Sequence, residues 1–257
     1  MNLKIIIFIG ILSVLLIGGF FVSKQDVIDI ISKNLEGITK FAVWSVSTAT
    51  YNNVNFSISS QEGTSTGLFI NSTGERMYIV GSGGDTVYSY TLSSPWNVSS
   101  ASYDNRNINV TSQDTAPTGI FFNGTGDKMY MVGAGNNDRI HQYNLTQAWN
   151  LSTATYDNVN FTITNQGANP SGMFINSSGE RMYVIIHPSD FNITIHQYTM
   201  SSPWNLSTAT YDNIQFNVSV SGNGAIEAGK DVFVGNNGTK MYVIDNDAGG
   251  GAADRVY

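Results

Sequence analysis

The sequence predicts an all-β protein made of repeated four-stranded sheets, which follow one N-terminal membrane-spanning helix. Tryptophan recurs at Trp44, Trp96, Trp149 and Trp204, with spacings of 52, 53 and 55 residues, and the sequence around each copy repeats with it. The segments between the tryptophans are short runs of β-type residues separated by Gly and Asn turns. A third observation, an apolar N-terminal run, predicts the helix.

The N-terminal segment, residues 1–23, contains an apolar run from Ile5 to Val22. As a helix this run would measure about 27 Å, close to the thickness of the hydrocarbon core of a bilayer. A cleaved signal peptide is the alternative, but Phe21-Val22-Ser23 does not resemble the small-residue site that cleavage needs. We therefore expect an uncleaved signal anchor, with the rest of the chain extracellular on the cell surface.

Residues 24–43 follow as a predicted amphipathic stalk. Its apolar residues fall on one stripe at helical spacing: Val27, Ile30, Ile31, Leu35 and Ile38. Asp26 and Asp29 would lie in the first turn, where the helix dipole favours negative charge. We expect this stalk to dock on the repeats or on the membrane surface.

The repeat region, residues 44–257, contains two repeating blocks. One runs from Trp149 to Tyr156 and the other from Gly119 to Tyr130, and both have copies in phase in the other repeats. Each repeat holds four strand-like runs, two of which are apolar on both faces. A sandwich would leave one face of each sheet polar. Sheets that stack on neighbours at both sides bury both faces, so the pattern favours the blades of a β-propeller.

One segment carries a family resemblance. Pro117-Thr-Gly-Ile-Phe-Phe-Asn-Gly-Thr-Gly-Asp-Lys-Met-Tyr-Met-Val132 resembles the YVTN-type, seven-bladed-like β-propeller repeat of cell-surface proteins. The shared features are the Pro-x-Gly start, the Gly-bearing hairpin and the following strand with Tyr and Val. The resemblance covers residues 44–257 and implies the fold and a surface location. It implies no activity, because propellers include both binders and enzymes.

The number of repeats predicts an incomplete propeller. The last residues, Arg255-Val-Tyr257, align with Thr86-Val-Tyr88 inside the third strand of an earlier repeat. Closed propellers have about 4 to 8 blades. Closure with four blades is the alternative, because the strand-like run from Tyr51 to Ile58 precedes the first full repeat and could complete the fourth.

The composition argues against several functions. The chain has no cysteine, 12% charged residues and a formal net charge of −7, so thiol chemistry is excluded and no nucleic-acid partner is expected. Nucleophile, zinc and phosphate-loop motifs are not found in the sequence. His141 and His196 share one repeat position, as packing residues do, and His187 falls in a loop without a visible partner. These observations favour a binding protein over an enzyme.

Ligand binding is predicted on one face of the array. This face carries the loops between the second and third strands of each repeat and the loops between successive repeats, which vary and are rich in Asp, Asn and Gly. The candidate ligand residues are Asp85, Asp138, Asp190, Asp245 and Asp247. No cofactor or metal is predicted, with Ca²⁺ as the alternative because Asp245-Asn-Asp247 partly matches a calcium loop.

The opposite face has nearly uniform turns and is predicted to carry N-linked glycans. The Asn-x-Ser/Thr sequence occurs 13 times in the chain. Seven of these asparagines belong to the uniform turns: Asn71, Asn97, Asn123, Asn150, Asn176, Asn205 and Asn237. They indicate a scaffold face that is exposed to a secretory route.

The predicted function is therefore a membrane-anchored, surface-displayed binding or adhesion module. Its predicted partners are the membrane, through the N-terminal helix, and a glycan or protein ligand at the cell surface. A propeller enzyme, such as a lactonase-like hydrolase or a lyase, and a structural component of the surface coat are the alternatives. An enzyme would gather convergent charged groups in the central channel, and charged residues are scarce in this sequence.

Overall fold

The computed structural model describes residues 15–17, 20–22, 50–136, 138–189, 192–218, 229–235, 238–245 and 255–256. Contacts divide the chain into two units, Met1–Ser45 and Val46–Tyr257. The division falls close to Trp44, where the repeats were predicted to start.

In the first unit, the described residues form a small antiparallel pair, β1 (Leu15–Ile17) and β2 (Phe20–Val22). These residues lie inside the predicted transmembrane helix and are extended instead of helical. A short run of Leu, Ile, Phe and Val fits a buried strand as well as a helix, so apolar character alone does not decide between them. The rest of residues 1–23 and the predicted stalk at 24–43 lie outside the described residues. Among those described, no helix is long and apolar enough to cross a bilayer, and the membrane anchor stays a prediction.

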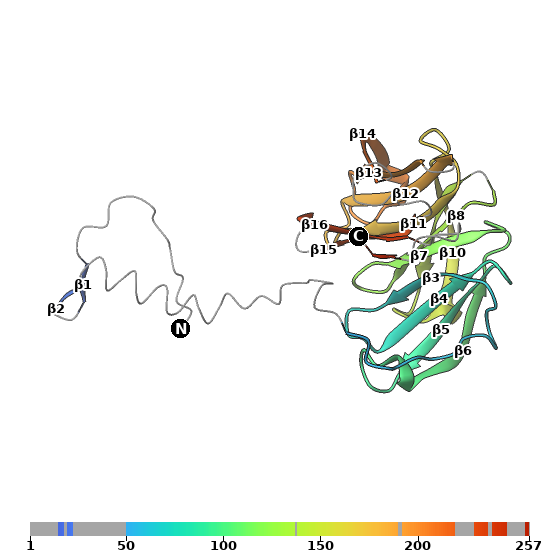
Figure 1. Ribbon diagram of the computed structural model, residues 1–257, viewed down its shortest axis with the longest axis horizontal. Coiled ribbons are helices and arrows are strands. Elements are labelled where there is room, and N and C mark those ends of the chain that lie inside the picture. Colours follow the sequence, from blue (N-terminus) through green and yellow to red (C-terminus); the bar gives the residue numbers. More distant parts are fainter. Residues whose placement is uncertain are drawn as a thin grey trace. The chain divides into compact units, whose positions relative to one another are not determined.

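The second unit consists of four antiparallel sheets, which we call the first to fourth blades (Figure 1). The first blade contains β3 (Ser65–Ile70), β4 (Arg76–Gly81), β5 (Thr86–Leu92) and β6 (Ala101–Asn109). The second blade contains β7 (Pro117–Phe122), β8 (Lys128–Gly133), β9 (Arg139–Leu145) and β10 (Ala154–Thr162). The third blade contains β11 (Pro170–Ile175), β12 (Arg181–Ser189), β13 (Asn192–Met200) and β14 (Ala209–Asn217). The fourth blade, as far as it is described, contains β15 (Gly229–Gly235), β16 (Lys240–Asp245) and β17 (Arg255–Val256).

Each blade is a meander in which the strands pair in chain order, so the predicted all-β blade repeat is confirmed. Short 3₁₀ helices precede the outer strands of the first three blades: η2 (Val98–Ser100), η3 (Leu151–Thr153) and η4 (Leu206–Thr208). The blades stack through their inner strands, with β3 on β7, β7 on β11 and β11 on β15. The core clusters draw side chains from two blades at once, for example Tyr130 of β8 with Val184 of β12. The strands β4 and β8, which are apolar on both faces, are therefore buried on both faces, as predicted, whereas Leu68 of β3 is 53% exposed.

Adjacent inner strands approach so closely at one position that a side chain does not fit there. A Cβ atom on Gly67 would lie 3.0 Å from the Cα of Gly119, and one on Gly119 would lie 3.3 Å from the Cα of Gly172. Beside the first glycine, the Thr66 hydroxyl donates to the Pro117 carbonyl of the next blade at 2.8 Å. The same bond recurs at 2.9 Å from Thr118 to Pro170 and from Ser171 to Gly229.

Each of the three repeated tryptophans that the structure describes closes its own blade. Trp149 has a φ of 64°, a left-handed conformation that is unusual for a bulky residue. Its N–H donates to the Gly126 carbonyl at 2.8 Å, and its ring lies over Gly126, whose φ is 74°. Trp96 lies on Gly74 and Trp204 lies on Gly179 in the same way.

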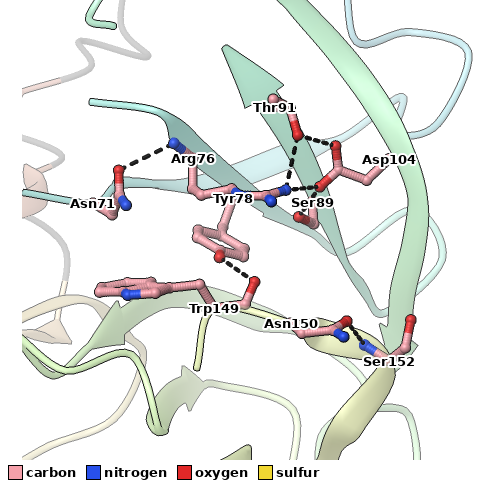
Figure 2. Close-up of polar contacts among 9 residues, drawn as sticks. All are labelled: Asn71, Arg76, Tyr78, Ser89, Thr91, Asp104, Trp149, Asn150 and Ser152. Atoms are coloured by element: carbon pink, nitrogen blue, oxygen red, sulfur yellow. Dashed lines mark hydrogen bonds and ion pairs between the residues drawn. The ribbon is translucent and has the colours of Figure 1, made fainter. Parts of the chain in front are cut away.

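The same tryptophan also ties its blade to the preceding one. Figure 2 shows the Tyr78 hydroxyl of β4 donating to the Trp149 carbonyl, at 2.7 Å. The Trp149 ring stacks on Phe69 of β3 with a centroid distance of 6.3 Å. Burial raises the pKa of the Tyr78 phenol, so this hydroxyl stays protonated and remains a donor. One blade further, Trp204 makes the same contacts with Tyr130 and Phe121.

Polar side chains fasten the outer strand to the rest of the blade. Arg76 of β4 donates to Thr91 of β5 and to Asp104 of β6, both at 2.8 Å (Figure 2). The third blade repeats this cluster with Arg181, Thr199 and Asp212. The outer strands are thus held by polar contacts, whereas the inner strands are held by packing.

The glycine under the tryptophan allows a matched test. We expect Gly126→Ala to lower the free energy of unfolding by about 2–3 kcal/mol, because the new Cβ would strain a left-handed residue and displace the Trp149 ring. Gly124→Ala, two residues earlier in the same turn, is the control, since a Cβ there meets nothing within 4 Å. Urea denaturation followed by tryptophan fluorescence measures both. Equal stabilities of the two variants would show that the ring does not depend on Gly126.

Candidate functional site

The structure describes the side chains of two of the five aspartates that were predicted to bind ligand. Asp85 and Asp138 occupy left-handed turn positions, with φ of 46° and 49°. Their main-chain carbonyls accept hydrogen bonds from Val110 (2.8 Å) and Ile163 (3.0 Å), which join the start of the third strand to the end of the fourth. Asp and Asn tolerate this conformation better than other residues, which accounts for the residue type at both positions. Ligand binding by these two aspartates stays a prediction.

The other three aspartates stay predictions. Asp190 and Asp247 lie outside the described residues, and only the backbone of Asp245 is described, at the end of β16. The predicted calcium alternative involves the same segment. Within the described ranges, no group of three or more His, Asp or Glu side chains is arranged to hold a metal ion.

Two buried carboxylates on the predicted ligand face were missed from the sequence. Asp114, in the loop before β7, is fully buried and accepts hydrogen bonds from the main-chain N–H groups of Ala116 (2.8 Å), Gly135 (2.9 Å) and Asn136 (3.1 Å). Glu62 makes the equivalent bonds one blade earlier, to Thr64 and Gly83. These bonds clamp the loop between blades onto the loop between the second and third strands, so both carboxylates serve the fold. Each carboxylate lies five residues before the inner-strand glycine of its blade, Gly67 or Gly119, and this shared spacing is the sequence signal that could have identified them.

The predicted glycosylation residues fall into two structural classes. Asn71, Asn123 and Asn176 shape the turn after the innermost strand, where their Oδ1 atoms accept main-chain hydrogen bonds. Asn71 and Asn123 are buried in these turns. Asn97, Asn150 and Asn205 instead cap η2, η3 and η4 on exposed turns, each accepting from a serine N–H at 3.1 Å. Asn237 lies outside the described residues. The three capping asparagines and Asn176 are therefore more accessible than Asn71 and Asn123.

A polar cavity of about 270 Å³ lies on the third blade. It opens between the outer strands β13 and β14 and the connection that leaves β10. Its lining residues are Asn165, Gln166, His196, Tyr211, Asn213 and Gln215. The sequence analysis did not find this cavity.

A β-bulge in the outer strand positions the cavity wall. The pairing of β13 with β14 shifts register between Gln197 and Tyr198, and Asn213 in the bulge has a φ of 57°. The first and second blades have the same bulge at Asn105 and Asn158. The bulge is thus present at the same position in all three of these blades.

The third blade differs in what holds the tyrosine hydroxyl. In the second blade, Asn160 donates its side-chain amide to the Tyr156 hydroxyl at 3.1 Å. In the first blade, Asn107 does the same to Tyr103 at 2.8 Å. Gln215 stands at this position in the third blade, and the Tyr211 hydroxyl lies 3.3 Å from the Nδ1 atom of His196 instead. The Gln215 side chain is one methylene longer than the asparagine of the other blades. The Tyr211 hydroxyl therefore bonds to His196, and the Gln215 amide lines the cavity.

His196 forms the floor of the cavity and is neutral. The side chain is 2% exposed, and its Nε2 atom lies 2.8 Å from the Thr194 hydroxyl. Burial lowers the pKa of His196, which keeps the ring uncharged at neutral pH. The other lining side chains are four amides and one phenol. The cavity thus offers amide, phenol and imidazole groups without a net charge.

The other histidines also have defined surroundings. His141 of the second blade is 3% exposed, packs beside the Tyr156 ring, and has a pKa that burial lowers. Its buried position agrees with the packing role that its repeat position predicted. His187 was predicted to lack a partner, but its Nε2 atom bonds to the Ser171 hydroxyl and the Gly229 carbonyl. It therefore belongs to the junction between the third and fourth blades.

No protein-family model and no curated protein matches the chain. Among solved structures, it is similar to a Bacteroides fragilis protein provisionally named a 6-phosphogluconolactonase, with 15% identity, a TM-score of 0.45 and coverage of 58% of this chain and 38% of that one. A functionally unknown protein from Desulfotomaculum acetoxidans is similar with 14% identity and a TM-score of 0.47, and the match covers 70% of this chain and 49% of that one. The Cps50 (Swd1) β-propeller domain from Myceliophteria thermophila is similar with 6% identity and a TM-score of 0.43, and the match covers 70% of this chain and 50% of that one. The chain spans half or less of each of these chains, and similarity at this level does not indicate what it binds.

The two buried histidines predict a pH dependence of stability. Their pKa values are depressed in the folded state, whereas the unfolded chain binds protons near pH 6.5. Their contribution is therefore complete above about pH 6.5 and is lost as the pH falls through the folded-state pKa values. We expect the urea midpoint to fall between about pH 7.5 and 5.5.

A variant isolates the histidine contribution. Changing His141 and His196 to Tyr, the residue at position 88 of the first blade, should weaken this pH dependence. Burial raises the pKa of Asp231 to about 6, so this carboxyl group makes stability rise as the pH falls. Asp231 is present in both the parent chain and the variant, so its effect cancels when the two are compared. An unchanged pH dependence in the variant would contradict the assignment.

Proposed function

We propose that the chain is a surface-displayed binding module whose third-blade cavity takes a neutral, hydroxyl-rich ligand such as a glycan residue. The observation that carries the proposal is the uncharged polar lining of the cavity. Asn165, Gln166, Asn213 and Gln215 supply amides, which both donate and accept hydrogen bonds. Sugar hydroxyls need such paired donors and acceptors, so the chemistry of the lining suits them.

The size and the aromatic wall support the same ligand class. A volume of about 270 Å³ lies just below the range of pockets for drug-sized molecules, so it suits about one ring. The Tyr211 ring offers an apolar surface beside the amides, and its hydroxyl adds a polar contact. An anionic ligand would find no cationic side chain among the six lining residues.

Surface display is the second part of the proposal. The apolar run from Ile5 to Val22 would anchor the chain in the membrane, with the blades outside. The capping asparagines at 97, 150 and 205 are placed on exposed turns, where attached glycans would be accommodated. Both features would suit adhesion to a neighbouring cell or to the surface coat.

The alternative of a propeller enzyme finds less support at this site. A lactonase-like hydrolase or a lyase would need a general base beside further charged groups. The lining contains no carboxylate, and burial lowers the pKa of His196 in it. We therefore favour binding.

An Asn/Gln exchange tests the cavity. We expect Gln215→Asn to recapture the Tyr211 hydroxyl as in the second blade, and to weaken glycan binding about tenfold through the loss of one or two hydrogen bonds. Asn160→Gln is the matched control at the same position of the second blade, and it should leave binding unchanged. The full chain is screened on a glycan array, and the affinity for the best glycan is measured by calorimetry. Equal affinities of Gln215→Asn and the parent chain, or a preference for charged glycans, would contradict the proposal.

A further inference from the structure

We propose that Lys128 and Asn144 of the second blade become joined by an amide bond that the chain forms by itself, with Asp157 carrying the proton. This inference is independent of the ligand of the third-blade cavity. It concerns the polar cluster that fastens the outer strand of a blade, which has a different composition in the second blade. An amine, a side-chain amide and a carboxyl group occupy the three positions there.

The first and third blades show the usual form of this cluster. In the first blade, the Arg76 guanidinium donates to Thr91 and to Asp104, and the Thr91 hydroxyl donates to Asp104 at 2.7 Å. The third blade holds an arginine, a threonine and an aspartate in the same arrangement. Arginine stays charged and threonine has no acyl group, so hydrogen bonds alone hold these two clusters.

The second blade changes the first two members together. Lys128 stands at the position of the arginine, and Asn144 stands at the position of the threonine. The two residues lie directly opposite each other on β8 and β9, and the Lys128 Nζ donates to the Asn144 Oδ1 at 3.0 Å. The amide carbon is bonded to this oxygen, so the amine and the carbon that it would attack lie side by side.

The third member, Asp157, is held beside this pair. Its carboxylate accepts a hydrogen bond from the side chain of Gln142, which lies two residues before Asn144 and on the same face of β9. Gln142 is buried, and its Oε1 accepts from the Leu206 N–H at 2.9 Å, which fixes its position. The equivalent Asp104 of the first blade bonds to both of the equivalent positions of β5. Asp157 is therefore placed to exchange protons with the reacting groups.

The reaction needs no partner from outside the chain. The amine releases its extra proton to solvent, and the Nζ lone pair attacks the Asn144 amide carbon to give a tetrahedral intermediate. A proton then passes from the attacking nitrogen to the Asp157 carboxylate and from there to the departing amide nitrogen. The original carbon–nitrogen bond breaks, and ammonia leaves. One carbon–nitrogen bond forms and one breaks, and nothing is oxidised or reduced.

The fold supplies the proximity that this slow reaction lacks between free molecules. Groups that are held in reacting geometry behave as if their concentration were about 10⁵–10⁸ M. Lys128 and Asn144 are half-buried, and the pairing of their strands holds them opposite each other. The product would link β8 to β9 covalently, so the two strands would stay joined even when the blade unfolds.

Mass spectrometry of the denatured full chain tests the proposal. The chain is made in a bacterial host without N-glycosylation and is purified in mild detergent. We expect its mass to be lower, by one ammonia molecule, than the mass calculated for the same chain without a cross-link. Trypsin should leave Lys128 uncleaved and release one branched peptide that joins residues 107–139 to residues 140–181. A chain at the full calculated mass would overturn the proposal.

The other blades supply matched control variants. Lys128→Arg and Asn144→Thr introduce the residues of the first and third blades, so both should fold and both should have the full calculated mass. Loss of ammonia that persists in Lys128→Arg would come from another site and would overturn the assignment. Circular dichroism checks that each variant is folded.

Two further variants test the proton carrier. Asp157→Asn keeps the shape of the side chain but cannot carry the proton, so the cross-linked fraction after a fixed time should fall at least about tenfold. Asp157→Glu should restore the cross-link, which a purely structural role would not require. An unchanged cross-linked fraction in Asp157→Asn would overturn the role of this residue.

Discussion

In each of the first three blades, one tryptophan lies over a left-handed glycine, and the rest of the array depends on this interaction. A bulky residue in the left-handed region costs about 1–2 kcal/mol. The bond from the Trp149 N–H to Gly126, the stack on Phe69 and the bond from the Tyr78 hydroxyl offset this cost. Because one residue serves both its own blade and the preceding one, closing a blade and stacking it are coupled. The array should therefore behave as a chain of nearest-neighbour interactions, as repeat proteins do.

This arrangement leaves the outer strands free to vary. The inner strands meet through Gly67, Gly119 and Gly172, and little can change there because a Cβ would collide with the neighbouring backbone or with side chains. The outer strands are held by side-chain hydrogen bonds and contain a bulge. Gln215 in place of the asparagine of the other blades therefore alters the surface without disturbing the stacking of the inner strands. A cavity can arise on such a scaffold at low cost in stability, since the altered contact is one partly exposed hydrogen bond.

The period and the apolar pattern were sufficient to predict the blades, because both follow from burial on two faces. The sequence could not separate two roles for Asp85 and Asp138, since a left-handed turn and a ligand site both favour aspartate, and their role in ligand binding stays a prediction. Glu62 and Asp114 occupy the same position of successive repeats, but they accept hydrogen bonds from main-chain N–H groups, which cannot be recognised from the sequence. The cavity was not predictable, because it depends on whether a side-chain amide reaches the Tyr211 hydroxyl. That is decided by one methylene and by the bulge at Asn213, which reads as an ordinary strand residue.

The departures from the repeat gather toward the third and fourth blades. Gly167 replaces the clamping carboxylate of Glu62 and Asp114, and the hairpin of β12 and β13 that follows is longer than its counterparts. At the next inner position, Asp231 stands where the other blades have glycine, and burial raises its pKa to about 6. At neutral pH this carboxylate is charged in a site that favours its neutral form, so it weakens the junction with the third blade. The first two blades thus keep the full set of repeated contacts, while the later blades lack some of them, and the cavity lies on one of these later blades. Ligand binding at the cavity would then take place where fewer repeated contacts constrain the blade.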